Sequence, residues 1–354
     1  MTLPIGLPIS PMLAKLVDEI PEADSIPGGW AYEPKWDGFR CIICRDGDLV
    51  ELGSRNNKPL TRYFPEVADL VRRTLPKRCV IDSELVVRTG TPRQEHLDWE
   101  AISQRIHPAQ SRIQRLSVET PGELVCYDLI ALDDQDFTAL PYRQRRAGLE
   151  ALFGQVPRGQ GMHLTSMTTD PAVAQAWFND FEGAGLDGVV AKGLGLPYVQ
   201  GKRTMLKIKH RRTAEAVVIG YRRHKRGHGV GSLLLGMYDA DGQLWPVGGI
   251  GAFSDTLRDT LEDQLQSLLI VDGRGEVTAF EKPRSRFSAS TDARAFPLRH
   301  ELVVEVAFDQ LEGRRFRHAV SLLRFRPDRE PQSCLIDQVD RPISYDLARV
   351  LDDE

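Results

Sequence analysis

The chain has 354 residues, of which 41% are hydrophobic and 27% are charged; these values are ordinary for a globular protein of two or three domains. No apolar run approaches the roughly 20 residues of a membrane span, and the N-terminus lacks the basic and apolar regions of a signal peptide, so a cytoplasmic protein without membrane contacts is expected. The net charge of −4 excludes a uniformly basic nucleic-acid-binding protein, so any such contact must come from a local patch.

The segment YEPKWDGFR, residues 32–40, is the first with an unusual pattern. If it begins as a strand, one face carries Trp30, Tyr32, Pro34 and Trp36. The other face then carries Glu33, Lys35 and Asp37, and Gly38 allows the chain to turn. For the segment by itself an exposed edge strand with mixed charges is the better explanation, because a K-x-D-G pattern occurs often by chance. A chemical role for Lys35 therefore requires partners from elsewhere in the chain.

The residues that follow alternate between strand and helix patterns up to about residue 210. Short β-branched runs predict strands at 79–87, 123–132 and 186–192. Two helices are predicted, one over 142–153 that ends at Gly154 and one that begins at the cap Asp170 and ends at Gly183 or Gly185. This part of the chain predicts a mixed α and β domain over residues 1–210.

Charged side chains interrupt several of these strands. Asp82 and Glu84 share one strand face inside an apolar run, and burying both is costly unless a cation or hydrogen bonds compensate them. Asp187 stands at a strand start, and Lys207 alternates with apolar residues together with Lys209. Such carboxylates and lysines suit a polyanion bound with a metal ion.

The pattern changes after residue 210. Strands are predicted at 214–221, 232–240, 243–250 and 301–308, and a helix capped by Ser254 is predicted over 254–269. Several short strands with one helix predict an OB-fold β-barrel domain over residues 211–354, and hence an α+β protein. Residues 271–299 are expected to form a long loop or weak structure.

One local basic patch lies in the loop YRRHKRGHG, residues 221–229. Its cationic side chains are Arg222, Arg223, Lys225 and Arg226. Composition alone does not decide between contact with nucleic acid and a solvated hairpin.

The five cysteines are scattered. Cys41 and Cys44 form a C-x-x-C pair, but no second pair follows at zinc-ribbon spacing, and residues three apart on a strand face opposite ways. Buried free thiols are therefore expected.

Seven segments, taken in chain order, resemble the motifs of the ATP-dependent DNA ligases within the covalent nucleotidyltransferase superfamily. The segments are EPKWDGFR, SRNNKPLTRYFPE, DSEL, CYDLI, LDGVVAK, LKIKHRR and RFRHAVSLLRFRPDR. The resemblance runs from residue 11 to 328 and is greatest to short bacterial ligases of the end-joining and repair type, namely the ligase C group and the ligase domain of ligase D.

The resemblance implies that Lys35 is the nucleophile that takes AMP from ATP. It also implies roles for other residues: Glu33 and Tyr127 at the adenine, Glu84 at the ribose or a metal, Asp187 at a metal, Arg40 and Arg55 at the nucleotide and the DNA 5′-phosphate, Lys207 and Lys209 at the α-phosphate, and Arg326, Asp328 and Arg329 at the departing pyrophosphate. Three positions depart from the family pattern: Ser83 replaces a glycine, Asp187 a glutamate and Arg329 a lysine. None removes a charge of the required sign, and the choice between Mg²⁺ and Mn²⁺ stays open.

A free lysine is almost wholly protonated at neutral pH and is a poor nucleophile. We expect Lys207, Lys209 and a divalent metal to lower the pKa of Lys35, while Asp37 acts in the opposite direction.

The implied function is ATP-dependent sealing of nicked or broken duplex DNA by a monomer, with Mg²⁺ or Mn²⁺ as cofactor and with other DNA-repair proteins as further candidate partners. An RNA ligase and an mRNA-capping guanylyltransferase remain alternatives, because both share the first motif and the barrel. A third alternative is a relic that binds nucleic acid without catalysis.

Overall fold

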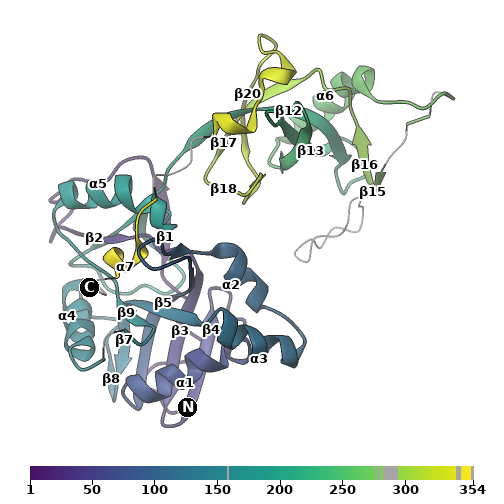
Figure 1. Cartoon of the computed structure of the whole chain (residues 1–354). Helices are drawn as coiled ribbons and strands as arrows, with labels where there is room; N and C mark the ends of the chain where they lie inside the picture. The colour runs from purple at the N-terminus through teal and green to yellow at the C-terminus, as the bar shows by residue number, and fades with distance from the viewer. Residues whose placement is uncertain (158, 275, 278–279, 282–293, 340–343, 352–354) are drawn as a thin grey trace. The chain divides into compact units, whose positions relative to one another are not determined.

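The computed structural model describes the chain except for residues 158, 275, 278–279, 282–293, 340–343 and 352–354. The described residues form two compact units, one of residues 1–209 together with 344–351, and one of residues 210–339 (Figure 1). The first unit mixes α-helices with β-sheets and the second is a β-rich unit of the OB type, which confirms the predicted fold class. No helix in this described part is long and apolar enough to cross a membrane.

Two sheets build the first unit. One has the order β1 (Leu13–Val17), β11 (Arg203–Ile208), β10 (Val189–Gly193) and β2 (Trp30–Pro34). The other has the order β4 (Leu49–Ser54), β3 (Phe39–Asp46), β5 (Arg78–Thr89), β7 (Gly122–Leu132) and β8 (Gln135–Asp136), with β6 (His96–Leu97) beside β5 and β9 (Met162–Leu164) beside β7. The strands predicted at 79–87, 123–132 and 186–192 are thus present as β5, β7 and β10.

Helices pack against these sheets. They are α1 (Pro65–Thr74), α2 (Trp99–Arg105), α3 (Gln110–Glu119), α4 (Tyr142–Phe153) and α5 (Pro171–Asp180), and the short α7 (Leu347–Val350) packs in an apolar cluster with Val86 and Val125 of the larger sheet. The Asp170 side chain accepts a hydrogen bond from the backbone N–H of Ala172 and so caps α5, as predicted. A 3₁₀ turn, Phe181–Ala184, extends α5, and Gly185 ends it with a φ of 88°.

An apolar core fills the space between the two sheets. Met12, just before β1, and Met205 of β11 pack against Ile42 and Val80 of the larger sheet. This core holds the sheets together, so that polar residues at the ends of β2, β10 and β11 lie close to those on β3, β5 and β7.

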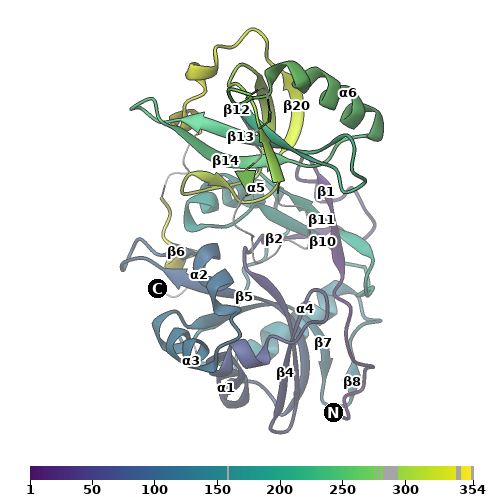
Figure 2. The ribbon, with the colours of Figure 1, turned by 90° about the vertical axis from the view of Figure 1, so that its right-hand side faces the viewer.

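The second unit is a five-stranded barrel. Antiparallel pairing gives the order β14 (Leu244–Ile250), β13 (Val230–Tyr238), β12 (Arg212–Arg223), β17 (Val303–Phe308) and β20 (Ser321–Phe325). Figure 2 shows β12, β13 and β14 side by side. A bridge between Ile250 and Val320 brings the start of β20 back to β14 and closes the circuit. Helix α6 (Asp255–Leu265), capped by Ser254 as predicted, buries Leu261 and Leu265 in the barrel core.

Smaller elements complete the list. They are β15 (Phe280–Glu281), β16 (Arg294–Pro297), β18 (Leu311–Glu312), β19 (Arg315–Phe316) and the 3₁₀ turns Thr61–Tyr63, Gln266–Leu268, Pro331–Ser333 and Ile336–Gln338. Residues 271–299, which were expected to form a long loop or weak structure, contain the short strands β15 and β16, and β16 pairs with β12 through Tyr221 and Phe296. Much of the remainder of that range lies outside the described residues.

The C-terminal segment differs from the expected domain boundary. We expected the second domain to run to residue 354, but the described residues 344–351 group with the first unit. The reason is apolar packing, since Leu347, Val350 and Leu351 are buried in a cluster of that unit.

All five cysteines are free and buried, as expected, and burial raises the pKa of the Cys44 thiol to about 12.

Candidate active site

Lys35 and Asp187 form the centre of the candidate site. Lys35 follows β2 and Asp187 precedes β10, and their backbones are joined by hydrogen bonds from Lys35 N to Gly188 O (2.8 Å) and from Asp187 N to Lys35 O (3.0 Å). Their side chains form an ion pair with 2.7 Å between Nζ and Oδ2. Lys209, just after β11, places its own Nζ 2.6 Å from the same Oδ2. One buried carboxylate therefore holds two lysines.

The charges around Lys35 act against the expected lowering of its pKa. Burial lowers this pKa, but the carboxylates of Asp187, Asp37 and Glu84 outweigh burial and raise it above the ordinary value. Among these carboxylates Asp187 contributes most, because it lies in direct contact with the ammonium group. The expected lowering includes a bound divalent metal and stays a prediction. The lysine whose pKa is lowered is Lys207, by burial and by Lys209, Lys35 and Arg55. Burial raises the pKa of Asp187, but the two paired lysines outweigh it and lower that pKa below its ordinary value.

Arg40 is fixed by a buried carboxylate. It donates two hydrogen bonds to Asp82, a fully buried residue, and one to the carbonyl of Met12. Tyr198 donates to the same carboxylate at 2.6 Å. The cation that the buried Asp82 requires is thus Arg40, whose guanidinium also lies 5.1 Å from the ring centroid of Tyr127.

Glu84 lies on the same strand as Asp82 and faces the Lys35 turn. It accepts hydrogen bonds from the backbone N–H of Gly38 (3.2 Å) and the hydroxyl of Tyr127 (3.4 Å). Desolvation, partly offset by Arg40 and Lys35, raises the pKa of its carboxyl group to about 7. A Cβ at Gly38 would lie 2.2 Å from the carbonyl oxygen of Leu85, so close backbone approach explains this glycine better than a turn conformation does.

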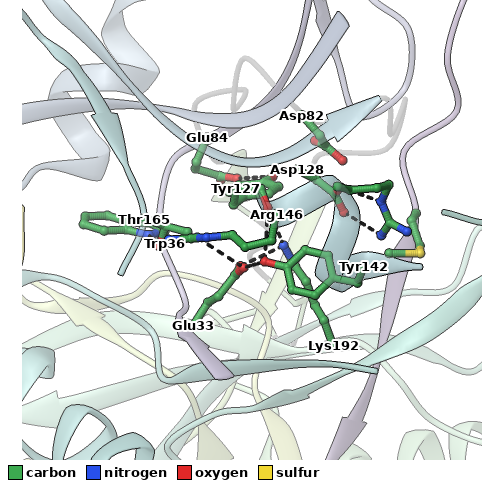
Figure 3. Close-up of polar contacts among 12 residues, drawn as sticks. Glu33, Trp36, Asp82, Glu84, Tyr127, Asp128, Tyr142, Arg146, Thr165 and Lys192 are labelled. Atoms are coloured by element: carbon green, nitrogen blue, oxygen red, sulfur yellow. Dashed lines mark hydrogen bonds and ion pairs between the residues drawn. The ribbon is translucent and has the colours of Figure 1, made fainter. Parts of the chain in front are cut away.

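Glu33 belongs to a buried cluster that sequence reasoning did not predict (Figure 3). Lys192 Nζ lies 2.8 Å from Glu33 Oε2, and Tyr142 donates its hydroxyl hydrogen to Oε1. The same Nζ donates to the backbone carbonyl of Tyr127 at 2.9 Å and lies 4.7 Å from the centroids of both tyrosine rings. Arg146, one turn after Tyr142 on α4, lies 4.0 Å from Glu33. The only sequence signal for this cluster was Lys192, a lysine at the end of an apolar strand.

The structure therefore brings together most of the residues predicted for the first domain. These are Glu33, Lys35, Arg40, Glu84, Tyr127, Asp187, Lys207 and Lys209. Arg55 follows β4 on the surface, near enough to Lys207 to influence its pKa. The remaining predicted residues lie on the second unit.

The basic loop on the second unit is already paired with acidic residues of α6. Arg223 lies 2.8 Å from Glu262, and Arg226 lies 3.1 Å from Asp255. Arg222 is partly buried at the end of β12, whereas Lys225 is exposed in the turn. These contacts favour the solvated-hairpin interpretation for two of the four cations and leave Lys225 exposed.

The last predicted group forms its own ion-pair network. Arg326 donates two hydrogen bonds to Asp328, at 2.9 and 2.7 Å, and also pairs with Glu215 on β12. Arg329 lies 3.3 Å from Glu215. The hydrogen bonds from Arg326 lower the pKa of Asp328 to about 2, so this exposed carboxylate is charged at any physiological pH.

The candidate metal ligands are two carboxylates, Glu84 and Asp187. Among the described residues no three His, Cys, Asp or Glu side chains are grouped as a metal site. Mg²⁺ often uses only one or two protein carboxylates together with waters and substrate phosphates, so Glu84 and Asp187 fit an ion that arrives with a nucleotide.

The fold and the site define a class of protein: a nucleotidyltransferase-type domain with a lysine between two sheets, followed by an OB-type barrel. Residues 11–209 match the family model described as ATP dependent DNA ligase domain, and residues 226–329 match the one described as ATP dependent DNA ligase C terminal region. The chain belongs to the family of ATP-dependent DNA ligases and is an enzyme of that family.

Similar proteins support the same family. The chain is 48% identical to DNA ligase C1 of Mycolicibacterium smegmatis, with all of both chains covered, and 48% identical to DNA ligase C of Mycobacterium tuberculosis, with 99% of each covered. A solved structure of a Lig E DNA ligase covers 90% of this chain and 99% of its own, at 18% identity and a TM-score of 0.55; that likeness shows the fold.

Proposed function

We propose that this ligase seals nicks and breaks in duplex DNA through AMP carried covalently on Lys35. The observation that carries the proposal is the position of Lys35, whose Nζ lies between two sheets and is held 2.7 Å from Asp187 beside a second lysine. A cationic pocket with a fixed nucleophile suits attack on a phosphate.

The reaction has three displacements at phosphorus. Nζ of Lys35, having given up a proton, attacks the α-phosphorus of ATP; a P–N bond forms, the bond to the bridging oxygen breaks, and pyrophosphate leaves. An oxygen of the DNA 5′-phosphate then attacks the same phosphorus, and the P–N bond breaks. Finally the 3′-hydroxyl, on losing its proton, attacks the 5′-phosphorus and AMP leaves. The nearest acceptor for the Lys35 proton is Asp187, because its Oδ2 is already hydrogen-bonded to Nζ.

The nucleotide contacts follow from the side chains around Lys35. Tyr127 offers a ring for stacking on adenine, and Glu33 retains acceptor capacity beyond its bonds to Lys192 and Tyr142, because a carboxylate offers about four lone-pair sites. Arg40 and Arg55 supply positive charge for the nucleotide and the 5′-phosphate, and Lys207 and Lys209 for the α-phosphate. When bound, Mg²⁺ or Mn²⁺ held by Glu84 and Asp187 supplies charge neutralisation at the phosphates.

Two sets of residues on the second unit complete the proposal. Arg326, Asp328 and Arg329 orient the departing pyrophosphate, and the basic loop contacts the DNA backbone. The similarity to ligase C enzymes supports a place in DNA repair or end joining, in which the chain acts as a monomer.

The test is the variant Lys35→Ala. It should form no acid-resistant adduct with α-labelled ATP, yet it should seal a nick that already carries AMP, because the lysine serves as carrier only in the first two displacements. Persistent labelling of the variant would refute the assignment of Lys35. Parallel assays with GTP and with nicked RNA duplexes should give little product, which separates this function from capping and RNA ligation.

A further inference from the structure

Residues 344–351 follow the second unit in sequence but are part of the first. Leu347 has 0% of its surface exposed and Val350 has 2%, as complete a burial as in the sheet cores. Figure 1 shows α7, in yellow, packed among elements of the first unit. A four-residue helix is too short to be stable by itself, so tertiary contacts hold this segment in place.

Those contacts are specific. The backbone N–H of Leu347 donates to the carbonyl of Glu95 at 3.0 Å. The Ser166 hydroxyl donates to the carbonyl of Val350 at 3.5 Å, and the ring of Tyr345 lies 5.2 Å from that of Phe181. The segment is therefore anchored by its backbone and by its side chains.

The cluster that receives the segment includes the neighbours of the reacting residues. Trp36 follows Lys35, Leu186 precedes Asp187, and both pack in one apolar cluster with Leu347 and Val350. The indole N–H of Trp36 donates to the hydroxyl of Thr165 at 2.8 Å, which fixes the ring. Each turn that carries half of the Lys35–Asp187 ion pair is thus packed against the same surface.

We propose that residues 344–351 are a positioning element for the nucleophile: they complete the apolar surface that holds the Lys35 and Asp187 turns in register. The inference rests on the proposed function of Lys35. Its chemical consequence should be selective, because Glu95, Ser166 and Phe181, which the segment contacts, are not among the residues proposed to bind ATP or DNA. The segment acts on the placement of Nζ relative to the α-phosphate, and a misplacement of about 1 Å can slow such a step by about 10²-fold.

The experiment compares cavity variants in the full-length protein. Leu347→Ala removes buried atoms from the cluster that includes Trp36 and Leu186, and Leu70→Ala removes the same atoms from α1, in a separate core cluster. Leu347→Met is the conservative replacement, and Tyr345→Ala is a milder variant at the edge of the cluster. For each variant the maximal rate of adduct formation with α-labelled ATP, the ATP concentration at half-maximal rate and the thermal midpoint are measured.

We expect Leu347→Ala to lower the maximal rate about tenfold or more while the half-saturating ATP concentration changes about twofold at most. Leu70→Ala should lose comparable stability without this loss of rate, and Leu347→Met should restore the rate. Equal rates in Leu347→Ala and the wild type, or rate losses that follow the thermal midpoint in both alanine variants, would overturn the inference. If Leu347→Ala does not fold, Tyr345→Ala against Leu70→Ala decides by the same criteria. A wild-type protein that forms no adduct at Lys35 would instead refute the proposed function.

Discussion

The Glu33 cluster of the first unit and the basic loop of the second both pair cations with carboxylates, but they do so in different surroundings. Glu33 and Lys192 are each only 3% exposed, and their polar atoms are satisfied by each other and by Tyr142 and a backbone carbonyl. The side chains of Arg226 and Asp255 are 58% and 69% exposed. Desolvated charges depend on their partners, whereas exposed charges exchange partners with water and ligands. The first arrangement is fixed by its partners, whereas the cations of the second can exchange theirs.

The largest effect on stability is expected at the buried pair. Lys192→Met leaves the Glu33 carboxylate buried without its cation and should cost about 3–5 kcal/mol of unfolding free energy, whereas Arg226→Met should cost no more than about 1 kcal/mol. Urea unfolding followed by tryptophan fluorescence suits the comparison. Four of the five tryptophans, namely Trp30, Trp36, Trp99 and Trp177, lie in the first unit.

A control sharpens this test. Glu33→Gln combined with Lys192→Met removes both charges and should recover much of the stability that the single variant loses. If Lys192→Met and Arg226→Met unfold at the same urea concentration, burial does not distinguish the two regions.

The next effect concerns the exposed network at the end of the barrel. The double variant Asp328→Ala and Arg329→Ala should reduce adduct formation at Lys35 by about tenfold or more, which corresponds to about 1.4 kcal/mol in the barrier. It should keep much of its activity on a nick that already carries AMP, because pyrophosphate leaves only in the first displacement. Sealing of ordinary and pre-adenylylated nicks is compared, with circular dichroism to confirm folding. A folded variant equally inactive on both substrates would mean that these residues act throughout the reaction.

A smaller effect is expected at the basic loop. Replacing Arg222, Arg223, Lys225 and Arg226 by glutamine should weaken binding to nicked duplex and reduce the slope of log affinity against log salt by about 0.9 for each DNA phosphate that the loop no longer neutralises. Adduct formation should change little. Lys225→Gln alone should show a larger share of this effect than Arg223→Gln, because Arg223 is engaged with Glu262. An unchanged slope in the fourfold variant would leave the loop as a solvated hairpin.

The smallest effect tests whether α6 competes with DNA for the loop. Asp255→Asn removes the partner of Arg226 and should tighten duplex binding at low salt by about two- to fivefold, or roughly 0.4–1 kcal/mol. The gain should disappear at high salt, since exposed pairs are screened. Weaker binding by this variant would show that the pair orders the loop for DNA instead of competing with it.

The sequence predicts the site best where a local residue pattern determines the side of a strand to which each side chain points. Alternation along β2 places Glu33 and Tyr32 on opposite faces, and the structure has Glu33 in the polar cluster and Tyr32 in the apolar cluster beside α5. The two carboxylates in the apolar run of β5 implied a nearby cation, but only the register of β3 against β5 identifies it. That register pairs Arg40 with Glu84, two residues from Asp82.

Other features depend on distances that no local pattern encodes. The expected lowering of the Lys35 pKa rests on Lys207, Lys209 and a bound divalent metal. The carboxylates of the chain itself raise this pKa, with Asp187 Oδ2 2.7 Å from Nζ. Lys192 and Tyr142 are 50 positions apart and meet only when β10 and α4 pack. The segment around Leu347 has too few residues for a helical period, so its burial could not be predicted.

The return of residues 344–351 to the first unit also sets the order in which a newly made chain can finish folding. Roughly 140 residues separate the end of the first long stretch, at residue 209, from Leu351, and ribosomes add about 5–20 residues per second. For about 7–28 s, therefore, Trp36 and Leu186 of the emerging first unit belong to a cluster that still lacks Leu347, Val350 and Leu351. A chain whose synthesis stops within the barrel would carry every residue around Lys35 yet lack the packing beneath it. The surroundings of the nucleophile are therefore completed only after residues 344–351 have been made.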